Sequence, residues 1–399
     1  MYLDRKPISL AEAQAHLAAI EIKPRMITKK AAEAHGFVLA EDILARFPIP
    51  FFRRSGMDGY GIIAADNDEN FPKDFEIIDN IGAGNVFDEN LKSGQVVRIM
   101  TGAKVPDDVV KVIMLELTKK NDENHVRILK NPRAINVAEI GEEVSKNDLI
   151  VPKGKRINAG ITSVLAAFGI SEVQVFDQPK VAVVATGSEL SENAEKNQGK
   201  IYNSNGPLLA SLVKENHAIL TGSYELTDDL DETRKLLSNL TAENDLVITT
   251  GGVSVGDFDF LAVIAKENEF LFNKLAMRPG SPTTGFVMNE TPVIALSGNP
   301  SACFTGFWFF AEPMIQRFQN QKTQIRQTSG NLTNGYGKKN EFDRYLNGVL
   351  DENHQVTLSG NGNSSELASL YQSNCFYRIP HETAVPENGL VEVWTIPER

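Results

Sequence analysis

Residues 245–259, DLVITTGGVSVGDFD, join a run of strand-forming residues to glycines, acids and the start of a predicted helix. Gly251, Gly252 and Gly256 carry no side chain, so backbone amides at these positions can approach an anion closely. The N-terminus of the following helix adds a partial positive charge. The segment therefore indicates a phosphate or pyrophosphate site. A tight strand-to-helix turn without a ligand is the alternative.

Two further segments end a predicted strand with a polar turn. Residues 294–302, IALSGNPSA, place Pro300 in the first turn of a helix and Ser301 beside free amides that could grip an oxyanion. Residues 185–190, ATGSEL, form a third such turn. Ligands of open α/β sheets bind at the carboxyl ends of the strands, so we expect one shared rim. Any one of these turns alone is weak evidence.

Acidic residues near the expected rim could hold a metal ion, because Mg²⁺ takes one or two carboxylates together with substrate phosphates. The candidates are Glu189, Asp228, Asp257 and Asp259. Helix capping explains Asp228 equally well, and Asp259 could simply favour a helix N-terminus.

A turn with an aspartate and a strand with a polar end lie earlier in the chain. Residues 53–60, RRSGMDGY, contain Asp58, and residues 99–104, IMTGAK, contain Thr101. An aspartate that bonds its own backbone in a turn, and a plain loop, are the alternative explanations.

Residue patterns predict the helices and strands that position these candidate residues. Ser9 and Glu12 predict a capping box at the start of a helix, and a second helix is expected near Thr28. After an apolar helical stretch at 157–168, strands and helices alternate from residue 181 onward, which predicts a mainly parallel sheet with helices on both faces. Short strands with polar turns follow beyond residue 326.

Composition narrows the class of protein. A formal net charge of -12 argues against binding to a nucleic-acid backbone, which needs a surface rich in lysine and arginine. Two cysteines are too few for a disulfide framework or a thiolate zinc site and fit a reducing compartment. The N-terminus has no signal-peptide pattern, and the apolar runs are too short to cross a bilayer. We expect a cytoplasmic protein without a membrane partner.

Taken together, ordered pieces of the chain resemble the molybdopterin molybdenumtransferases, the MoeA and gephyrin E-domain family. The matching pieces are SGMDGYGI, IMTGAKVPDD, GEEVSKND with VPKGKRI, VAVVATGSEL, GKIYNSN, TDD, TTGGVSVGDFDF, MRPGSP and LSGNPSA. The resemblance implies a fold of class α/β plus β, divided into five segments. These are a helical linker domain in two parts (1–44 and 136–177), a β-rich domain (45–135), an α/β molybdopterin-binding domain with three layers (178–325) and a small C-terminal β domain (326–399).

The resemblance also implies an activity. Family members are transferases of molybdenum cofactor biosynthesis that take adenylylated molybdopterin and molybdate, cleave the adenylate with Mg²⁺ present and release AMP. They are homodimers with the active site at the subunit interface, and a molybdopterin adenylyltransferase is the expected upstream partner. A catalytically degenerate paralogue that binds pterin or a partner protein as a scaffold is the alternative. The β domains and the MDGY and MTGA segments argue against an adenylyltransferase.

Carried over residue by residue, the resemblance implies site residues at positions that match the motifs. The catalytic set is Asp58, Thr101, Glu189, Asp228 and Asp259, of which Asp228 and Asp259 would bind the metal. The substrate-binding set is Gly251, Gly252, Ser254, Gly256, Asp257, Asn299, Ser301, Arg278, Pro282, Arg344 and Ser369.

The chain departs from the family pattern at charged positions. Ser281 replaces the second lysine of a K-P-G-K-P segment, and Arg53 replaces an aspartate. Ala138, Glu139 and Ile140 replace a cluster of arginines. The loss of cations from a site that handles anions should weaken charge neutralisation. We hypothesise that Arg53, Arg54, Lys104 or Arg278 compensates for this loss.

Overall fold

The computed structural model describes residues 6–191, 193–196, 199–226, 229–252 and 260–397. The chain divides into two compact units, each described here by itself. The larger unit comprises Met1–Ala40, Arg156–Asn158 and Glu172–Arg399, and the smaller comprises Glu41–Lys155 and Ala159–Ser171. The division into five segments stays a prediction.

The larger unit begins with the predicted capped helix, Leu10–Ala19 (α1). Ser9 Oγ accepts a hydrogen bond from the Glu12 amide at 3.2 Å, and the Glu12 carboxylate accepts one from the Ser9 amide at 2.8 Å. The helix expected near Thr28 is wrong, because Met26–Lys30 forms a strand (β1). That strand pairs antiparallel with Glu172–Phe176 (β13), a partner distant in sequence that a local pattern does not reveal. The short strand Val38–Leu39 (β2) lies on the other side of β13.

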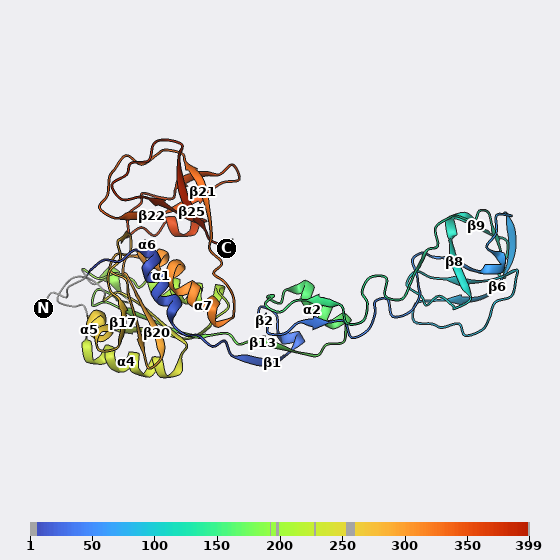
Figure 1. The fold of residues 1–399 in the computed structure, drawn as a ribbon, viewed down its shortest axis with the longest axis horizontal. Helices are drawn as coiled ribbons and strands as arrows, with labels where there is room; N and C mark the ends of the chain where they lie inside the picture. Colours follow the sequence, from blue (N-terminus) through green and yellow to red (C-terminus); the bar gives the residue numbers. More distant parts are fainter. Residues whose placement is uncertain (1–5, 192, 197–198, 227–228, 253–259, 398–399) are drawn as a thin grey trace. The chain divides into compact units, whose positions relative to one another are not determined.

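A mixed sheet forms the centre of the larger unit, and Figure 1 labels two of its strands, β17 and β20. The strand order is β15-β14-β16-β20-β19-β17. Its strands are Lys180–Thr186 (β14), Ile219–Leu226 (β15), Leu246–Thr250 (β16), Glu269–Phe272 (β17), Thr284–Met288 (β19) and Thr291–Leu296 (β20). β15, β14, β16 and β20 run parallel, whereas β19 and β17 are antiparallel to their neighbours. The predicted alternation therefore yields a mainly parallel sheet, with an antiparallel edge.

Helices cover both faces of this sheet, as the sequence predicts. Besides α1, the α-helices of this part of the larger unit are Asn205–Glu215 (α3), Leu230–Glu243 (α4), Phe260–Lys266 (α5), Pro300–Gly306 (α6) and Glu312–Phe318 (α7). A π-helical turn lies at Phe307–Ala311 (η5), and 3₁₀ turns lie at Ala31–Glu33 (η1) and Ala194–Lys196 (η4). One core cluster joins the sheet to α1, α3, α6 and η5, and another joins it to α4 and α5. The strands β14, β16, β19 and β20 are buried on both faces, which explains their largely apolar sequences.

A barrel-like β sheet ends the larger unit. Its strands are Arg326–Leu332 (β21), Asp343–Leu350 (β22), Gln355–Leu358 (β23), Cys375–Ile379 (β24) and Gly389–Thr395 (β25), with the short helix Ser369–Gln372 (α8). The order β22-β23-β21-β25-β24 closes on itself, because β22 also pairs with β24. The strand Met277–Arg278 (β18), which comes from the α/β part of the chain, joins this sheet through a parallel pairing with β22. β18 therefore ties the two parts of the larger unit together.

The smaller unit is built on a sheet in the order β8-β5-β7-β6-β10-β9. Its strands are Gly59–Ile63 (β5), Lys73–Ile81 (β6), Gln95–Ile99 (β7), Val109–Met114 (β8), Thr118–Lys120 (β9) and His125–Ile128 (β10). Two strand pairs lie outside this sheet, Ile43–Leu44 (β3) with Leu149–Val151 (β12) and Arg54–Ser55 (β4) with Val137–Ala138 (β11). The unit also contains Ala159–Ala167 (α2) and the 3₁₀ turns Ala64–Asp66 (η2) and Leu115–Leu117 (η3). Across the described ranges, no helix has the length and apolar character that a membrane span requires.

Candidate active site

Two adjoining pockets lie in the larger unit and share Pro282, Ser297 and Asn299. The first, which we name the cationic pocket, has a volume of about 540 Å³ and is lined by Lys274, Arg278 and Arg344 among others. The second, which we name the turn pocket, has a volume of about 850 Å³ and is formed by the polar turns at the strand ends. Because the pockets share a wall, an anion in one lies beside a ligand in the other.

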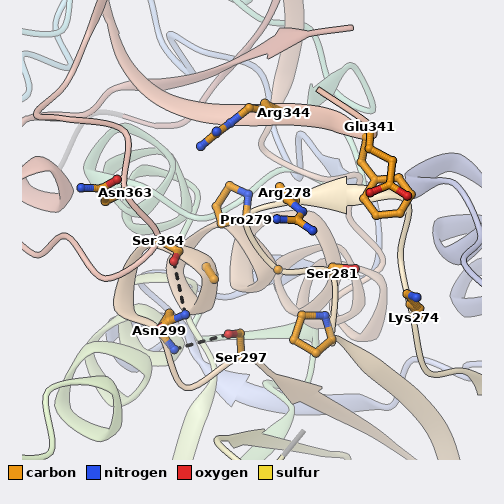
Figure 2. Close-up of a pocket in the computed structure, with 14 residues that line it drawn as sticks. Lys274, Arg278, Pro279, Ser281, Ser297, Asn299, Glu341, Arg344, Asn363 and Ser364 are labelled. Atoms are coloured by element: carbon orange, nitrogen blue, oxygen red, sulfur yellow. Dashed lines mark hydrogen bonds between the residues drawn. The ribbon is translucent and has the colours of Figure 1, made fainter. Parts of the chain in front are cut away.

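The two arginines of the cationic pocket are neighbours because of strand register. In the parallel pair β18 and β22, Arg278 is the register partner of Arg344 (Figure 2). Arg344 donates to the Gly362 carbonyl at 3.0 Å, and its buried Nε has no hydrogen-bond partner in the described part of the chain. Neither arginine forms an ion pair with a described carboxylate under 4.0 Å. The pocket therefore presents two guanidinium groups that have no ion-pair partner among the described residues, and the Glu341 carboxyl lines the same pocket.

Lys274 lines the cationic pocket together with Ser281, the position where the resemblance leads us to expect a lysine. Ser281 Oγ donates to the Leu275 carbonyl at 2.7 Å, and the Leu275 amide donates to the Ser281 carbonyl at 2.8 Å. This pairing fixes the chain beside Lys274, which lines the same pocket. Sequence reasoning missed Lys274. A half-buried lysine within the apolar run FLFNKLAM was the only indication of it.

The turn pocket brings together the three strand-end turns that the sequence predicts to share a rim. It is lined by Thr186 at the end of β14 and Glu189 after it, by Gly251 and Gly252 after β16, and by the turn at 297–300 after β20. A side chain at Gly251 would place its Cβ 1.9 Å from the Thr186 carbonyl oxygen, at a φ of +88°. Only glycine fits there, because the neighbouring turns approach backbone to backbone.

The remaining predicted residues of the larger unit fall in different places. Asn299 lines both pockets, and its Nδ2 donates to Ser364 Oγ at 3.2 Å (Figure 2). Ser301 and Ser369 are buried and line neither pocket, and Asn347 Nδ2 donates to both hydroxyls. The remaining predicted positions are outside the described residues: Asp228, Ser254, Gly256, Asp257 and Asp259. Within the described ranges, no group of three or more histidine, cysteine or acidic side chains could hold a metal ion.

Asp58 and Thr101 form a contact within the smaller unit. One Asp58 carboxylate oxygen accepts hydrogen bonds from the Thr101 amide and hydroxyl, both at 2.7 Å. These two bonds, with a smaller contribution from the charge of Arg98, lower the pKa of Asp58. The next residue, Gly59, packs so closely that a Cβ there would lie 2.1 Å from the Ile113 carbonyl oxygen. Asp58 is therefore an ionised, oriented acid at the edge of the sheet.

The charge departures in the smaller unit are coupled. Arg53 Nε lies 3.3 Å from Glu139 Oε1, so two residues at which we expect departures from the family pattern form an ion pair with each other. Arg54 and Lys104 face each other in an isolated β-bridge. Of the residues hypothesised to compensate for lost cations, Arg278 is the one that lines the cationic pocket.

Comparisons with known proteins cover almost the whole chain. A family model described as the MoeA N-terminal region (domain I and II) matches residues 8–169, and one described as a probable molybdopterin binding domain matches residues 182–317. A molybdopterin molybdenumtransferase of Staphylococcus epidermidis is 37% identical over 390 residues, which cover 95% of this chain and 93% of that protein. A protein of the same name from Staphylococcus aureus is 37% identical over 387 residues, covering 94% and 92%.

Solved structures agree with these matches. The crystal structure of the molybdopterin biosynthesis MoeA protein from Pyrococcus horikoshii has a TM-score of 0.84 and 27% identity, and the match covers 99% of this chain and 100% of that one. The match to the staphylococcal enzymes covers almost the whole chain and therefore includes both units. This chain belongs to the molybdopterin molybdenumtransferase family, the enzymes of molybdenum cofactor biosynthesis.

Proposed function

We propose that this chain inserts molybdate into adenylylated molybdopterin, with cleavage of the adenylate and release of AMP. The observation that carries the proposal is the register pairing of Arg278 with Arg344 in the cationic pocket, which shares lining residues with the turn pocket. Molybdate is a tetrahedral dianion, and guanidinium groups bind such oxyanions through charge-assisted hydrogen bonds. Lys274 adds a third cation to the same pocket.

The turn pocket fits the pterin substrate. Gly251 and Gly252 line this pocket without side chains, so a ligand can approach their backbone closely, and the N-terminus of α6 follows Asn299. Both features favour the phosphate groups of an adenylylated ligand. Since Ser297 and Asn299 line both pockets, molybdate in the cationic pocket would lie next to the part of the ligand that receives the metal. The protein's contribution is to position two anions side by side and to neutralise their charge.

Mg²⁺ is part of the proposed reaction, where it would neutralise charge on the pyrophosphate that is cleaved. Asp228 and Asp259 are its proposed ligands, and Glu189 is an exposed carboxylate that lines the turn pocket. Oxygen donors of this kind are the ligands that Mg²⁺ prefers. We also propose Asp58 and Thr101 as catalytic residues, supplied within a homodimer whose active site lies at the subunit interface. The proposal further includes a molybdopterin adenylyltransferase upstream and a cytoplasmic location.

The test is a turnover assay with adenylylated molybdopterin, molybdate and Mg²⁺, in which AMP release is followed. The proposal expects AMP release that depends on molybdate and that falls in Arg344→Gln at molybdate concentrations below the KM. Arg326→Gln is the matched control, since Arg326 is an exposed arginine of the same barrel that lines neither pocket. Tight pterin binding without AMP release would instead indicate a scaffold.

A further inference from the structure

Asn205, the first residue of α3, is a buried amide that lines the turn pocket. Its side chain is 7% exposed, so more than nine-tenths of it is removed from solvent. A buried amide of this kind normally satisfies both its donors and its acceptor. At Asn205 one of these groups has no partner among the residues that the structure describes.

The orientation of the amide is determined by its neighbours. Asn205 Nδ2 lies 2.8 Å from the Gly298 carbonyl oxygen and 2.9 Å from Thr250 Oγ1. A carbonyl oxygen only accepts, so the atom that faces Gly298 must be the amide nitrogen. Thr250 Oγ1 uses its own hydrogen to donate to the Ser297 carbonyl at 3.0 Å, and it must therefore accept from Asn205. Both contacts exclude the flipped amide.

The consequence is that Asn205 Oδ1 is a fixed acceptor. This atom is buried and has no hydrogen-bond partner among the residues that the structure describes. An unpaired buried acceptor destabilises the protein, and only a donor relieves it. Molybdate and ionised phosphate oxygens are acceptors themselves, so neither is suited to this position.

A second unpaired group lies in the same pocket. Thr186 Oγ1 is buried and has no partner in the described part of the chain. Thr186 ends β14, and Thr250 ends the adjacent strand β16. Two buried polar atoms in one pocket that have no partner among the described residues indicate a ligand that brings its own hydrogen-bonding groups in addition to its anionic groups.

We propose that Asn205 Oδ1 accepts a hydrogen bond from an exocyclic amino group on a heterocycle of the substrate. The inference rests on the proposed function, because that function places an adenylylated pterin in the turn pocket. Such a ligand has two exocyclic amino groups that can donate this hydrogen bond, one on the pterin and one on the adenine. Asn205 thereby determines specificity for amino-substituted over oxo-substituted rings.

The experiment compares matched pairs of compounds by calorimetric titration of the full-length protein. Pterin is compared with lumazine, and AMP with IMP, since in each second compound an oxygen replaces the amino group. An oxygen at that place would face Oδ1 acceptor to acceptor. We expect one pair to differ by about tenfold or more in Kd, and the pair that differs identifies the ring. Equal binding within both pairs, or no binding of any of the four compounds, would overturn the proposal.

Variants of the protein provide the second measurement. Asn205→Leu keeps a similar shape without the acceptor, and it should reduce the difference within the pair to about twofold or less. Thr250→Ser keeps the hydroxyl that orients the amide and should preserve the difference. An undiminished difference in Asn205→Leu would also contradict the proposal. Molybdate-dependent AMP release is measured with the same wild-type preparation. AMP release without a difference between the paired compounds would contradict this inference and leave the proposed function in place.

Discussion

Arg53 Nε lies 3.3 Å from Glu139 Oε1, and the guanidinium also donates to the Pro106 carbonyl at 3.2 Å. The Arg53 side chain is 20% exposed and that of Glu139 is 61% exposed. The positive charge of Arg53 is therefore already paired within the smaller unit. This finding argues against Arg53 as a replacement for a lost cation of the anion-binding site.

The first prediction follows from this pairing. Arg53→Gln should leave the KM for molybdate within about twofold of wild type, because its charge serves a local contact. Glu139→Gln should lower the free energy of unfolding by no more than about 1 kcal/mol, as expected for an exposed ion pair. Steady-state kinetics and chemical denaturation measure the two effects. A tenfold rise in KM for Arg53→Gln would show that the arginine does contact the anion.

The cations of the cationic pocket should behave differently. Arg278→Gln, Arg344→Gln and Lys274→Gln should each raise the KM for molybdate by about tenfold or more, because a hydrogen bond to a charged group contributes about 1.5–3 kcal/mol. Arg326→Gln serves as the control for the loss of an arginine. An unchanged KM in Lys274→Gln would mean that this lysine does not replace the cation missing at Ser281.

Gly251 should tolerate no side chain. In Gly251→Ala the new Cβ would lie 1.9 Å from the Thr186 carbonyl oxygen, so the turn must shift and AMP release should fall at least tenfold. Gly84 has a similar φ of +90° with open space around it, and Gly84→Ala should cost only about 1 kcal/mol of stability. Turnover and thermal denaturation of the two variants distinguish the effect of the close contact with Thr186 from the effect of a positive φ alone.

The Asp58 and Thr101 contact predicts a shift in a pH profile. Loss of the hydroxyl in Thr101→Val removes the strongest of the interactions that lower the pKa of Asp58, so that pKa should rise toward its ordinary value. If Asp58 acts as an ionised acid, the acidic limb of the kcat profile should move to higher pH in this variant. Thr101→Ser retains the hydroxyl and should leave the profile in place. An NMR titration of the carboxyl group checks the pKa without reference to activity.

Glu312 should make stability depend on pH. This residue is fully buried, and burial raises its pKa from 4.5 to about 7, although the Thr323 hydroxyl and the Gln324 amide oppose the rise. The unfolded chain ionises Glu312 more readily, so its contribution is fully present below pH 4.5 and is lost as the pH rises through about 7. The loss is on the order of 3 kcal/mol.

The variant Glu312→Gln should remove this dependence. Between pH 5 and 8 the free energy of unfolding should decline in wild type and should change much less in the variant, because glutamine does not titrate. Glu215→Gln, at an exposed position of α3, is the control and should keep the wild-type decline. Parallel slopes for wild type and Glu312→Gln would show that the buried carboxyl does not titrate in this range.

Local patterns were sufficient for a large part of the fold. The capping box at Ser9 and Glu12, the alternation of strands and helices after residue 181, and the glycine turn after β16 all depend on neighbours in sequence. Such features carry their own hydrogen-bonding and burial requirements, so residue order alone predicts them. The three polar turns also follow from it, because parallel strands place their carboxyl ends at one edge.

Tertiary structure decided the features that depend on distant partners. The segment around Thr28 is a strand because β13 pairs with it, and no local pattern specifies that pairing. Arg278 faces Arg344 only through the register of β18 with β22. The pairing of Arg53 with Glu139, the place of Lys274 in the pocket and the orientation of the Asn205 amide have the same origin. Each depends on which atoms meet in space, and long-range contacts of that kind are set by the packing of the whole unit.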